Sequence, residues 1–357
     1  MTGPLRVAQV MAGAPMGGAE TFYERLCLAL HRSGEAEVLA VVRREPGREA
    51  RLRAGGLSPV ALRFGGPLDL ATGPRLRAAL RAFAPGVVVA WMNRAAGFAP
   101  RGPWALVGRL GGRYDLRHYA RCDALVANTR GLVDWIAEGG WDRARVHHLP
   151  NFAPDLAGAA PAADLPVPSP GPPRRLLAMG RLHANKGFDT LLRALALPPL
   201  AGAFLWLAGE GPERGALERL AREAGVADRV AFLGWRTDTA ALLAACEVFV
   251  VPSRVEPLGN VVLEALSAAR PVVAAAADGP REVLEDGRTG LLVPVDAPEA
   301  MARAVASLLA DPARAAALAA AGRAEYEAHH AEAPVLARWL AFLRAASADA
   351  PHRARAA

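Results

Sequence analysis

The single lysine of this chain lies in a segment whose residue types suit phosphate binding. Of the 42 Lys and Arg residues, only Lys186 is lysine, and it follows Arg181 by five positions. Lysine carries a compact, rotatable ammonium, whereas arginine presents a wide planar fork. We expect Arg181 and Lys186 to point at one diphosphate, because both flank a turn between a predicted strand and a predicted helix. A surface lysine without a binding role is the competing interpretation.

A second group of polar residues follows another predicted strand. Glu256 lies in the loop, and Glu264 lies about two turns into the next helix. Leu258, Gly259, Asn260 and Val261 begin that helix, so their backbone N–H groups can face phosphate oxygens. One carboxylate can accept hydrogen bonds from sugar hydroxyls and the other from a ribose. Two glutamates at this spacing are ordinary surface charge in isolation, but their place downstream of the Lys186 loop favours a binding site.

A pair of glycines near the N-terminus offers a third candidate anion site. Gly17 and Gly18 precede a predicted helix over residues 21–31, where glycine lets backbone N–H groups approach an anion. The spacing is not the GxGxxG pattern, and no acid directly follows the second predicted strand, so an NAD site is not expected. An NADP site that uses Arg43 or Arg44 is a weaker alternative. A tight turn that binds no ligand is the other interpretation of this glycine pair.

These residues must be positioned by short apolar strands that alternate with helical patterns. Buried, all-apolar strands between helices predict α/β architecture with doubly wound parallel sheets. Predicted helices include residues 188–197, 297–309, 311–329 and 334–345. The predicted strands are residues 6–11, 37–42, 59–62, 87–91, 105–108, 124–127 and 145–148, then 175–179, 203–208, 230–233, 248–251, 271–274 and 290–293.

A proline-rich segment divides the chain. Residues 150–173 contain eight prolines, which predicts an extended linker and not a packed element. We expect a first domain over residues 1–160, a second over 161–330, and a C-terminal helix and tail over 331–357. Open α/β sheets bind ligands at the carboxyl ends of their strands, so two such domains predict a ligand cleft between them. The C-terminal helix is expected to cross back and brace the first domain, and a membrane-contact helix is the alternative interpretation.

Composition and charge restrict the class of protein. The 357 residues are 52% hydrophobic and 22% charged, which is typical of a globular protein, and neither a signal peptide nor a membrane span is expected. Three cysteines without CxxC spacing predict neither disulfides nor a zinc site, which fits a reducing cytoplasm. Residues 1–150 hold 21 Arg against 12 acids, so we expect an anionic partner such as a phosphorylated lipid or a membrane surface. Nucleic acid is not expected, since no recognised motif is present, and a solvated basic surface is the alternative.

Taken together, these motifs resemble a known family. The order of the segments is similar to that of the large family of retaining, nucleotide-sugar-dependent glycosyltransferases with the GT-B fold, family four, which has two Rossmann-like domains facing across a cleft. Residues 91–95 and 108–112 resemble a bacterial subgroup assigned to lipopolysaccharide or related envelope glycans. The segments that carry the resemblance are residues 17–20, 180–187, 208–212, 232–235, 252–253, 256–264, 270–274, 279–280 and 286–293.

The resemblance implies roles for the matching positions. Arg181 and Lys186 neutralise the donor diphosphate, Glu256 holds donor-sugar hydroxyls, and Glu264 binds the ribose. Backbone groups approach the phosphates from two places, and one further segment lies near the base. These donor-binding positions are Gly17 and Gly18, then Leu258, Gly259, Asn260 and Val261, then Gly234, Trp235 and Arg236.

The chain departs from the family pattern at one position. Many members place a histidine after the strand that matches residues 105–108, and here that place carries no histidine. The role is therefore left open, with Asn93, Arg94, Arg109 and His118 as acceptor-side candidates. No DxD pair follows a strand, so no metal and no other cofactor is expected. A retaining enzyme without a placed carboxylate nucleophile is expected to react on one face of the sugar, the leaving phosphate assisting deprotonation of the acceptor.

The sequence thus predicts a retaining glycosyltransferase that moves a sugar from a UDP- or GDP-sugar donor to a hydroxyl of an acceptor. The acceptor is expected to be an anionic envelope glycan or glycolipid, and the location to be cytoplasmic or peripheral on the inner membrane. A non-catalytic nucleotide-sugar-binding or membrane-scaffold protein is the alternative, followed by an NADP-dependent oxidoreductase.

Overall fold

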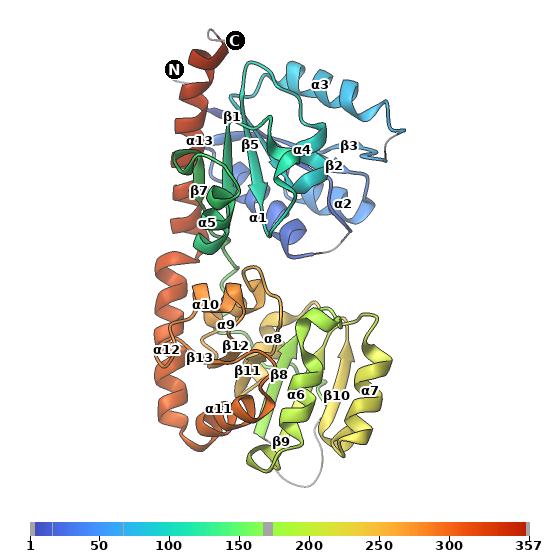
Figure 1. Ribbon diagram of the computed structural model, residues 1–357, viewed down its shortest axis with the longest axis vertical. Helices are drawn as coiled ribbons and strands as arrows, with labels where there is room; N and C mark the ends of the chain where they lie inside the picture. Colours follow the sequence, from blue (N-terminus) through green and yellow to red (C-terminus); the bar gives the residue numbers. More distant parts are fainter. Residues whose placement is uncertain (1–3, 16, 67, 167–173, 355–357) are drawn as a thin grey trace. The chain divides into compact units, whose positions relative to one another are not determined.

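The structure, a computed structural model, describes residues 4–15, 17–66, 68–166 and 174–354. The chain divides into two compact units, Met1–Phe152 with Glu332–Ala357, and Ala153–Ala331. Each unit is a parallel sheet flanked by helices (Figure 1). The first unit ends at Phe152 and not at residue 160, and the final helix belongs to it.

The first unit contains a seven-stranded sheet in the order β3-β2-β1-β4-β5-β6-β7, and every pair of neighbours is parallel. Its strands are β1 (Leu5–Met11), β2 (Ala36–Arg43), β3 (Val60–Leu62), β4 (Val87–Trp91), β5 (Ala105–Leu110), β6 (Ala124–Ala127) and β7 (Val146–His148). Its helices are α1 (Gly18–Arg32), α2 (Pro46–Ala54), α3 (Thr72–Phe83), α4 (Met92–Phe98), α5 (Arg130–Glu138) and α13 (Glu332–Ala354), with 3₁₀ turns at Leu116–Tyr119 and Arg143–Arg145.

The second unit contains a six-stranded parallel sheet in the order β10-β9-β8-β11-β12-β13. Its strands are β8 (Arg174–Met179), β9 (Ala203–Ala208), β10 (Val230–Gly234), β11 (Val248–Val251), β12 (Val272–Ala275) and β13 (Leu291–Val293). Its helices are α6 (Phe188–Leu195), α7 (Arg214–Glu223), α8 (Thr239–Ala245), α9 (Asn260–Ser267), α10 (Asp278–Val283), α11 (Pro298–Ala310) and α12 (Pro312–His329), with 3₁₀ turns at Ala184–Lys186, Pro198–Leu200 and Ala227–Arg229.

Burial on both faces explains why the strands are so apolar. Every residue of β4 and of β9 is buried, and the core residues of each unit form two clusters. Helix-covered parallel sheets require this pattern because neither face meets water. Each strand predicted from the sequence is present among the described residues, and the doubly wound α/β fold is confirmed.

The last helix, α13, packs its apolar side into the first unit. Trp339 is fully buried and stacks on Trp91 of β4, with ring centroids 6.4 Å apart and planes 11° apart. Val335 and Leu343 are also fully buried. The interpretation of this helix as a membrane-contact element is therefore wrong, because its apolar side chains are covered by the sheet.

Among the described residues, no single helix is long and apolar enough to cross a membrane. One pair of consecutive helical segments, Pro298–Ala310 and Pro312–Ala350, has the required length and composition when taken together, but the pair is bent by 103°.

The proline-rich segment is partly packed, which corrects the prediction of an unpacked linker. Residues 151–166 contain no helix or strand, as expected, but Ala153 and Leu165 are buried against the second unit's core. Trp206 donates its indole N–H to the carbonyl of Pro166 at 2.8 Å. Residues 167–173 lie outside the described part of the chain.

Candidate active site

The order of strands in the second unit brings two polar loops together. The chain moves outward from β8 in one direction through β9 and β10, and in the other through β11, β12 and β13. The loops that leave the carboxyl ends of β8 and β11 therefore diverge at a topological switch point, where open α/β sheets bind ligands. These loops, residues 180–187 and 252–259, carry the two strongest sequence motifs.

The lone lysine and the first glutamate meet at this point. Lys186, at the end of the 3₁₀ turn Ala184–Lys186, donates from Nζ to Oε2 of Glu256 in a short ion pair. Ser253 Oγ donates to the same carboxylate oxygen at 3.2 Å. The lysine side chain is 25% exposed and that of the glutamate 10%, so the ammonium stays accessible from solvent while the carboxylate is nearly enclosed.

The close approach of the two loops depends on a glycine. Gly187 has φ of 62°, in the left-handed region, and separates the 3₁₀ turn from α6. A Cβ at this position would lie under 3.0 Å from the carbonyl oxygen of Pro252. Any other residue would push the two loops apart and with them the Lys186–Glu256 pair.

Arg254, which the sequence analysis did not single out, fastens the same two loops. Its backbone N–H donates to the carbonyl of Asn185 at 2.8 Å, and its guanidinium bonds Asp189 in a bidentate ion pair and Asp296 in another. The hydrogen bond from Arg254 holds the pKa of Asp189 below its usual range. The position of Arg254 between Ser253 and Glu256 was the only sequence signal for a role in this site. Its partners Asn185, Asp189 and Asp296 are distant in sequence, so the contacts themselves could not be predicted.

Helix α9 begins directly after the loop that carries Glu256. Gly259 is its N-cap with φ of 88°, and no side chain caps this end of the helix. Leu258 is buried, and Gly279 packs against it so closely that a Cβ there would lie under 3.0 Å from the Leu258 backbone. The Gly279 N–H also donates to the carbonyl of Glu256 at 2.8 Å, which fixes the loop. Asn260, Val261 and Glu264 are half-buried in the first turns of the helix.

The other donor-side candidates differ in their availability. Arg181 is exposed and has no hydrogen bond or ion pair to any described residue. Trp235 is 52% exposed, next to Gly234 with φ of 71°. Arg236, in contrast, is held by ion pairs to Asp164 and Asp238. Arg181 and Trp235 are therefore open to a ligand in this structure, whereas the Arg236 guanidinium is engaged within the protein.

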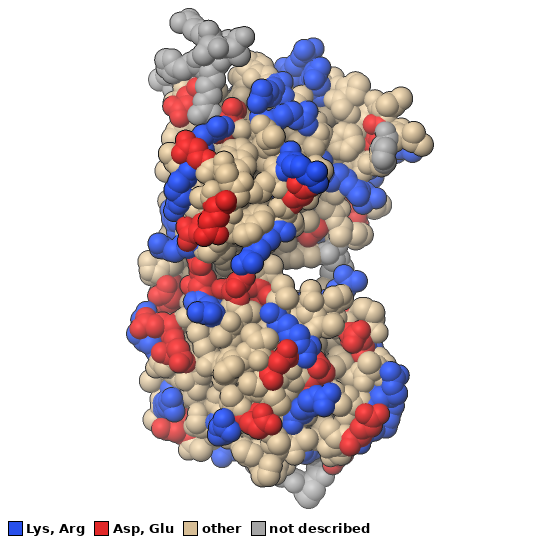
Figure 2. Space-filling model, viewed as in Figure 1, with Lys and Arg blue, Asp and Glu red and all other residues tan. Residues whose placement is uncertain are grey.

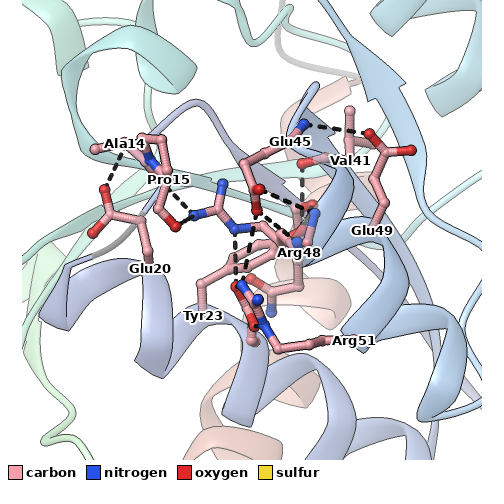
Figure 3. Close-up of polar contacts among 12 residues, drawn as sticks. Ala14, Pro15, Glu20, Tyr23, Val41, Glu45, Arg48, Glu49 and Arg51 are labelled. Carbon is pink, nitrogen blue, oxygen red and sulfur yellow. Dashed lines mark hydrogen bonds and ion pairs between the residues drawn. The ribbon is translucent and has the colours of Figure 1, made fainter. Parts of the chain in front are cut away.

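The glycine loop of the first unit is organised by Glu20. This carboxylate is buried and accepts a hydrogen bond from the Ala14 N–H at 2.8 Å (Figure 3). A Cβ on Gly13 or on Gly17 would lie under 3.0 Å from its oxygens. Gly17 is the N-cap of α1, and Gly18 is its first residue. Both glycines that flank the carboxylate thus make room for it, a constraint that the sequence analysis did not foresee.

Arg48 of α2 holds this loop from the other side. It is fully buried and donates to the carbonyl oxygens of Ala14 at 2.6 Å and Pro15 at 3.2 Å, and to Glu24 Oε1 at 3.0 Å (Figure 3). A buried guanidinium needs such partners because desolvation without them is costly. The loop is therefore pinned by Glu20 through an N–H group and by Arg48 through carbonyl groups.

The acceptor-side candidates lie at the carboxyl ends of β4 and β5 and in the turns beyond. Arg109 is 1% exposed, lies over the rings of Trp91 and Phe22, and donates to Asn151 Oδ1. Burial without a carboxylate partner lowers its pKa to about 10. Its side chain is thus enclosed by aromatic rings in this structure.

The remaining three candidates have separate surroundings. Asn93 is half-buried, and its Oδ1 has no hydrogen-bond partner among the described residues. Arg94 is exposed and donates to the carbonyl of Phe64 at 3.2 Å. His118 is exposed in the turn Leu116–Tyr119. Of the four, Asn93 and Arg109 have a buried polar atom, Oδ1 and Nε respectively, without a hydrogen-bond partner among the described residues.

The sequence is similar to that of known glycosyltransferases along most of its length. Residues 173–311 match the family model described as Glycosyl transferases group 1, and residues 16–154 match Glycosyltransferase Family 4. Two relatives from Rhizobium meliloti are named as lipopolysaccharide core biosynthesis glycosyltransferases. LpsE is 36% identical, and the match covers 83% of this chain and 86% of LpsE. LpsD is 35% identical, and the match covers 86% of this chain and 89% of LpsD.

Solved structures share the fold at low sequence identity. A glycosyltransferase from Rickettsia africae has a TM-score of 0.83 at 15% identity, covering 96% of this chain and 98% of its own. The Anabaena protein HepE in complex with UDP and glucose has a TM-score of 0.79 at 20% identity, covering 96% and 100%. The architecture of this chain is therefore that of the GT-B fold.

Proposed function

This chain belongs to the group 1 glycosyltransferases of family 4, and from that premise we propose that it is a retaining enzyme for envelope glycan assembly. It transfers a sugar from a UDP- or GDP-sugar to a hydroxyl of a lipopolysaccharide-type or related acceptor. The observation that carries the donor assignment is the Lys186–Glu256 pair beside the uncapped start of α9. It supplies a cation, a carboxylate and backbone donors at one sheet edge.

Lys186 and Arg181 act on the leaving group in this proposal. Cleavage of the sugar–phosphate bond builds negative charge on the nucleoside diphosphate. Fixed cations and the N–H groups at the start of α9 stabilise that charge more in the transition state than in the ground state. Arg181 is exposed and unpaired among the described residues, so its charge is available without breaking an internal contact.

Glu256 acts on the sugar. Without a ligand its carboxylate accepts from Lys186 and Ser253. When the diphosphate draws the ammonium away, the carboxylate oxygen is freed to accept hydrogen bonds from sugar hydroxyls. The pair thus exchanges one internal contact for two contacts with the donor, which favours a sugar nucleotide over a bare nucleotide.

Retention and metal independence are part of the same proposal. Glu20 is engaged by the Ala14 N–H, and Glu256 is assigned to the sugar hydroxyls, which supports a same-face reaction in which the leaving phosphate accepts the proton of the acceptor hydroxyl. Within the described residues, no three His, Cys, Asp or Glu side chains gather as a set of metal ligands. Lys186 and Arg181 can supply the positive charge that a metal would otherwise bring. Activity is expected to survive chelation by EDTA.

The acceptor assignment rests on the relatives and on charge. LpsE and LpsD are named for lipopolysaccharide core biosynthesis, and the basic first unit suits an anionic glycan or glycolipid. We place the enzyme in the cytoplasm, in peripheral contact with the inner membrane. Family membership argues against the NADP-dependent oxidoreductase, and no nucleic-acid partner is proposed.

A thermal-shift panel tests the donor site. Wild type and Lys186→Ala are compared with UDP, GDP, ADP, NADP and common sugar nucleotides. We expect stabilisation of the wild type by one nucleoside diphosphate and its sugar conjugate, and a weaker shift in the variant. No shift with any nucleotide, or a shift with NADP alone, would contradict the proposal. Binding without transfer to any lipopolysaccharide acceptor would favour the non-catalytic scaffold.

A further inference from the structure

One stretch of the first unit is almost free of acidic residues. Between Glu49 and Asp115 the chain has ten arginines and a single acid, Asp69. The stretch includes β3, the loop after it, α3 and β4. Figure 2 shows basic side chains over α3. The ten are Arg51, Arg53, Arg63, Arg75, Arg77, Arg81, Arg94, Arg101, Arg109 and Arg113.

Two leucines stand out from the loop that leads into α3. Leu68 is 94% exposed and Leu70 84%, the highest values among the exposed large hydrophobic residues of the described chain. Leucines this exposed have no role in the core, and paired apolar side chains at a loop tip mark a contact with another apolar surface.

Hydrogen bonds within the loop define its conformation, and both leucines lie on its exposed side. Asp69, between them, accepts from the Gly65 N–H at 2.7 Å and from the Thr72 hydroxyl at 2.6 Å. The base of the loop is anchored by Phe64, which is fully buried and packs edge-on against Phe98. The one acid of the stretch is thus turned into the loop, and the leucines are turned out of it.

Helix α3 supplies charge beside this tip. Leu76 and Leu80 face the core and are fully buried, whereas Arg75, Arg77 and Arg81 are exposed. None of the three arginines forms an ion pair with a described residue, and the helix contains no acid. The surface therefore combines an apolar tip of two leucines with arginines that lack counter-charges.

We propose that the loop of Leu68 and Leu70, with Arg75, Arg77 and Arg81 of α3, docks onto an anionic phospholipid surface. Arginines attract anionic headgroups, and the leucines enter the boundary between headgroups and acyl chains. A second copy of this chain fits poorly, since the same face would set arginine against arginine. A nucleic acid would use the arginines and leave the leucines without a partner. The inference gives the proposed peripheral membrane contact a surface, and its test does not depend on sugar transfer.

Vesicle co-sedimentation of the full chain tests the docking surface. The probes are vesicles of phosphatidylethanolamine with phosphatidylglycerol, and neutral vesicles of phosphatidylcholine. The variants are Leu68→Ser with Leu70→Ser, and Arg75→Gln with Arg77→Gln and Arg81→Gln. A matched control removes the same charge from exposed arginines of the second unit, Arg193→Gln with Arg219→Gln and Arg222→Gln.

We expect wild type and the control to bind anionic vesicles and to release them as salt rises. Each docking variant should bind anionic vesicles at least about tenfold more weakly than wild type. Its melting temperature should be unchanged, because the altered side chains are exposed. Equal binding by wild type and the leucine variant would overturn the proposal, because the arginines would then bind the vesicles by charge alone, as they would bind any polyanion. Lack of wild-type binding at low salt would overturn it as well. A lipid-independent dimer that the leucine variant loses would assign the face to a second copy. A failure in any of these assays leaves the nucleotide assay above unaffected, so the two proposals fail separately.

Discussion

Lys186 and Glu256, 70 positions apart in the chain, form an ion pair where the loops after β8 and β11 meet. The lysine is the only one in the protein, and the glutamate is nearly enclosed. Glu256 is also held by Ser253, and Gly187 lets the two loops touch. The pair joins the group proposed to stabilise the leaving phosphate to the group proposed to hold the sugar.

Removal of the lysine should impair transfer with little effect on folding. Lys186→Ala is expected to lower kcat/KM by roughly 30- to 1000-fold, about 2–4 kcal/mol of transition-state stabilisation. Lys186→Arg should rescue little, because a planar fork does not replace a compact ammonium in a tight loop. Steady-state kinetics with the donor found by thermal shift provide the measurement. A loss below threefold for the alanine variant would sink the phosphate role.

Neutralising the carboxylate should separate recognition of the sugar from recognition of the nucleotide. Glu256→Gln frees Lys186 from its internal partner, so binding of the nucleoside diphosphate should hold or tighten. Binding of the sugar nucleotide should weaken by about tenfold, as expected when a charged hydrogen-bond acceptor is lost. Isothermal titration of both ligands measures the difference. Equal weakening of the two would remove Glu256 from the sugar site.

Crowding the two loops should damage both stability and activity. Gly187→Ala adds a Cβ against the Pro252 carbonyl at a left-handed backbone position, and we expect a loss of about 2–4 kcal/mol in the free energy of unfolding. Gly202→Ala is the matched control, because nothing lies within 4 Å of a Cβ there. Urea denaturation of both variants is the check. Similar free energies of unfolding for Gly187→Ala and Gly202→Ala would show that the two loops can move apart at little energetic cost.

The buried arginine behind the glycine loop should be coupled to its glutamate. Arg48→Met removes the buried guanidinium that donates to Glu24 and to the carbonyls of Ala14 and Pro15, and it is expected to destabilise the fold by about 2–4 kcal/mol. Glu24 keeps its bidentate ion pair with Arg51 in this variant, so Glu24→Gln should cost less stability in the Arg48→Met background than in the wild type. A double-mutant cycle in denaturant measures the coupling free energy. Strict additivity of the two changes would mean that the Arg48–Glu24 ion pair contributes nothing to stability. Arg51, which also bonds Glu24, is kept unchanged in all variants.

The three thiols should be unreactive in the folded protein. Cys27, Cys122 and Cys246 are buried, and burial raises the pKa of Cys122 and of Cys246 from 9.0 to about 12. The folded state therefore keeps these protons between pH 9 and 12 while the unfolded state releases them. The thiol contribution to stability should be constant below pH 9 and fall as pH rises above it. Reaction with a chromogenic disulfide at pH 8 should be slow until guanidinium is added, and rapid labelling of native protein would contradict the burial.

Local sequence patterns were sufficient to predict the strands and the family-type motifs of this protein. Alternating apolar runs and turn residues are local signals, so every predicted strand appears in the structure. The Lys186 and Glu256 loops could be named because each directly follows a strand, and parallel strands end at one edge of a sheet. The resemblance to retaining GT-B glycosyltransferases rested on the same local segments, and the family and fold were confirmed.

Tertiary structure decided the contacts between segments that are distant in sequence. Arg254 fastens the two loops, Arg48 holds the glycine loop, and Arg109 is enclosed by Trp91 and Phe22, although none of these arginines differs from a surface arginine in its local sequence. The proline-rich segment looked like a linker and is partly packed, because the second unit's core covers Leu165. Burial and pairing are set by which elements the fold places side by side, and a local pattern does not carry that information.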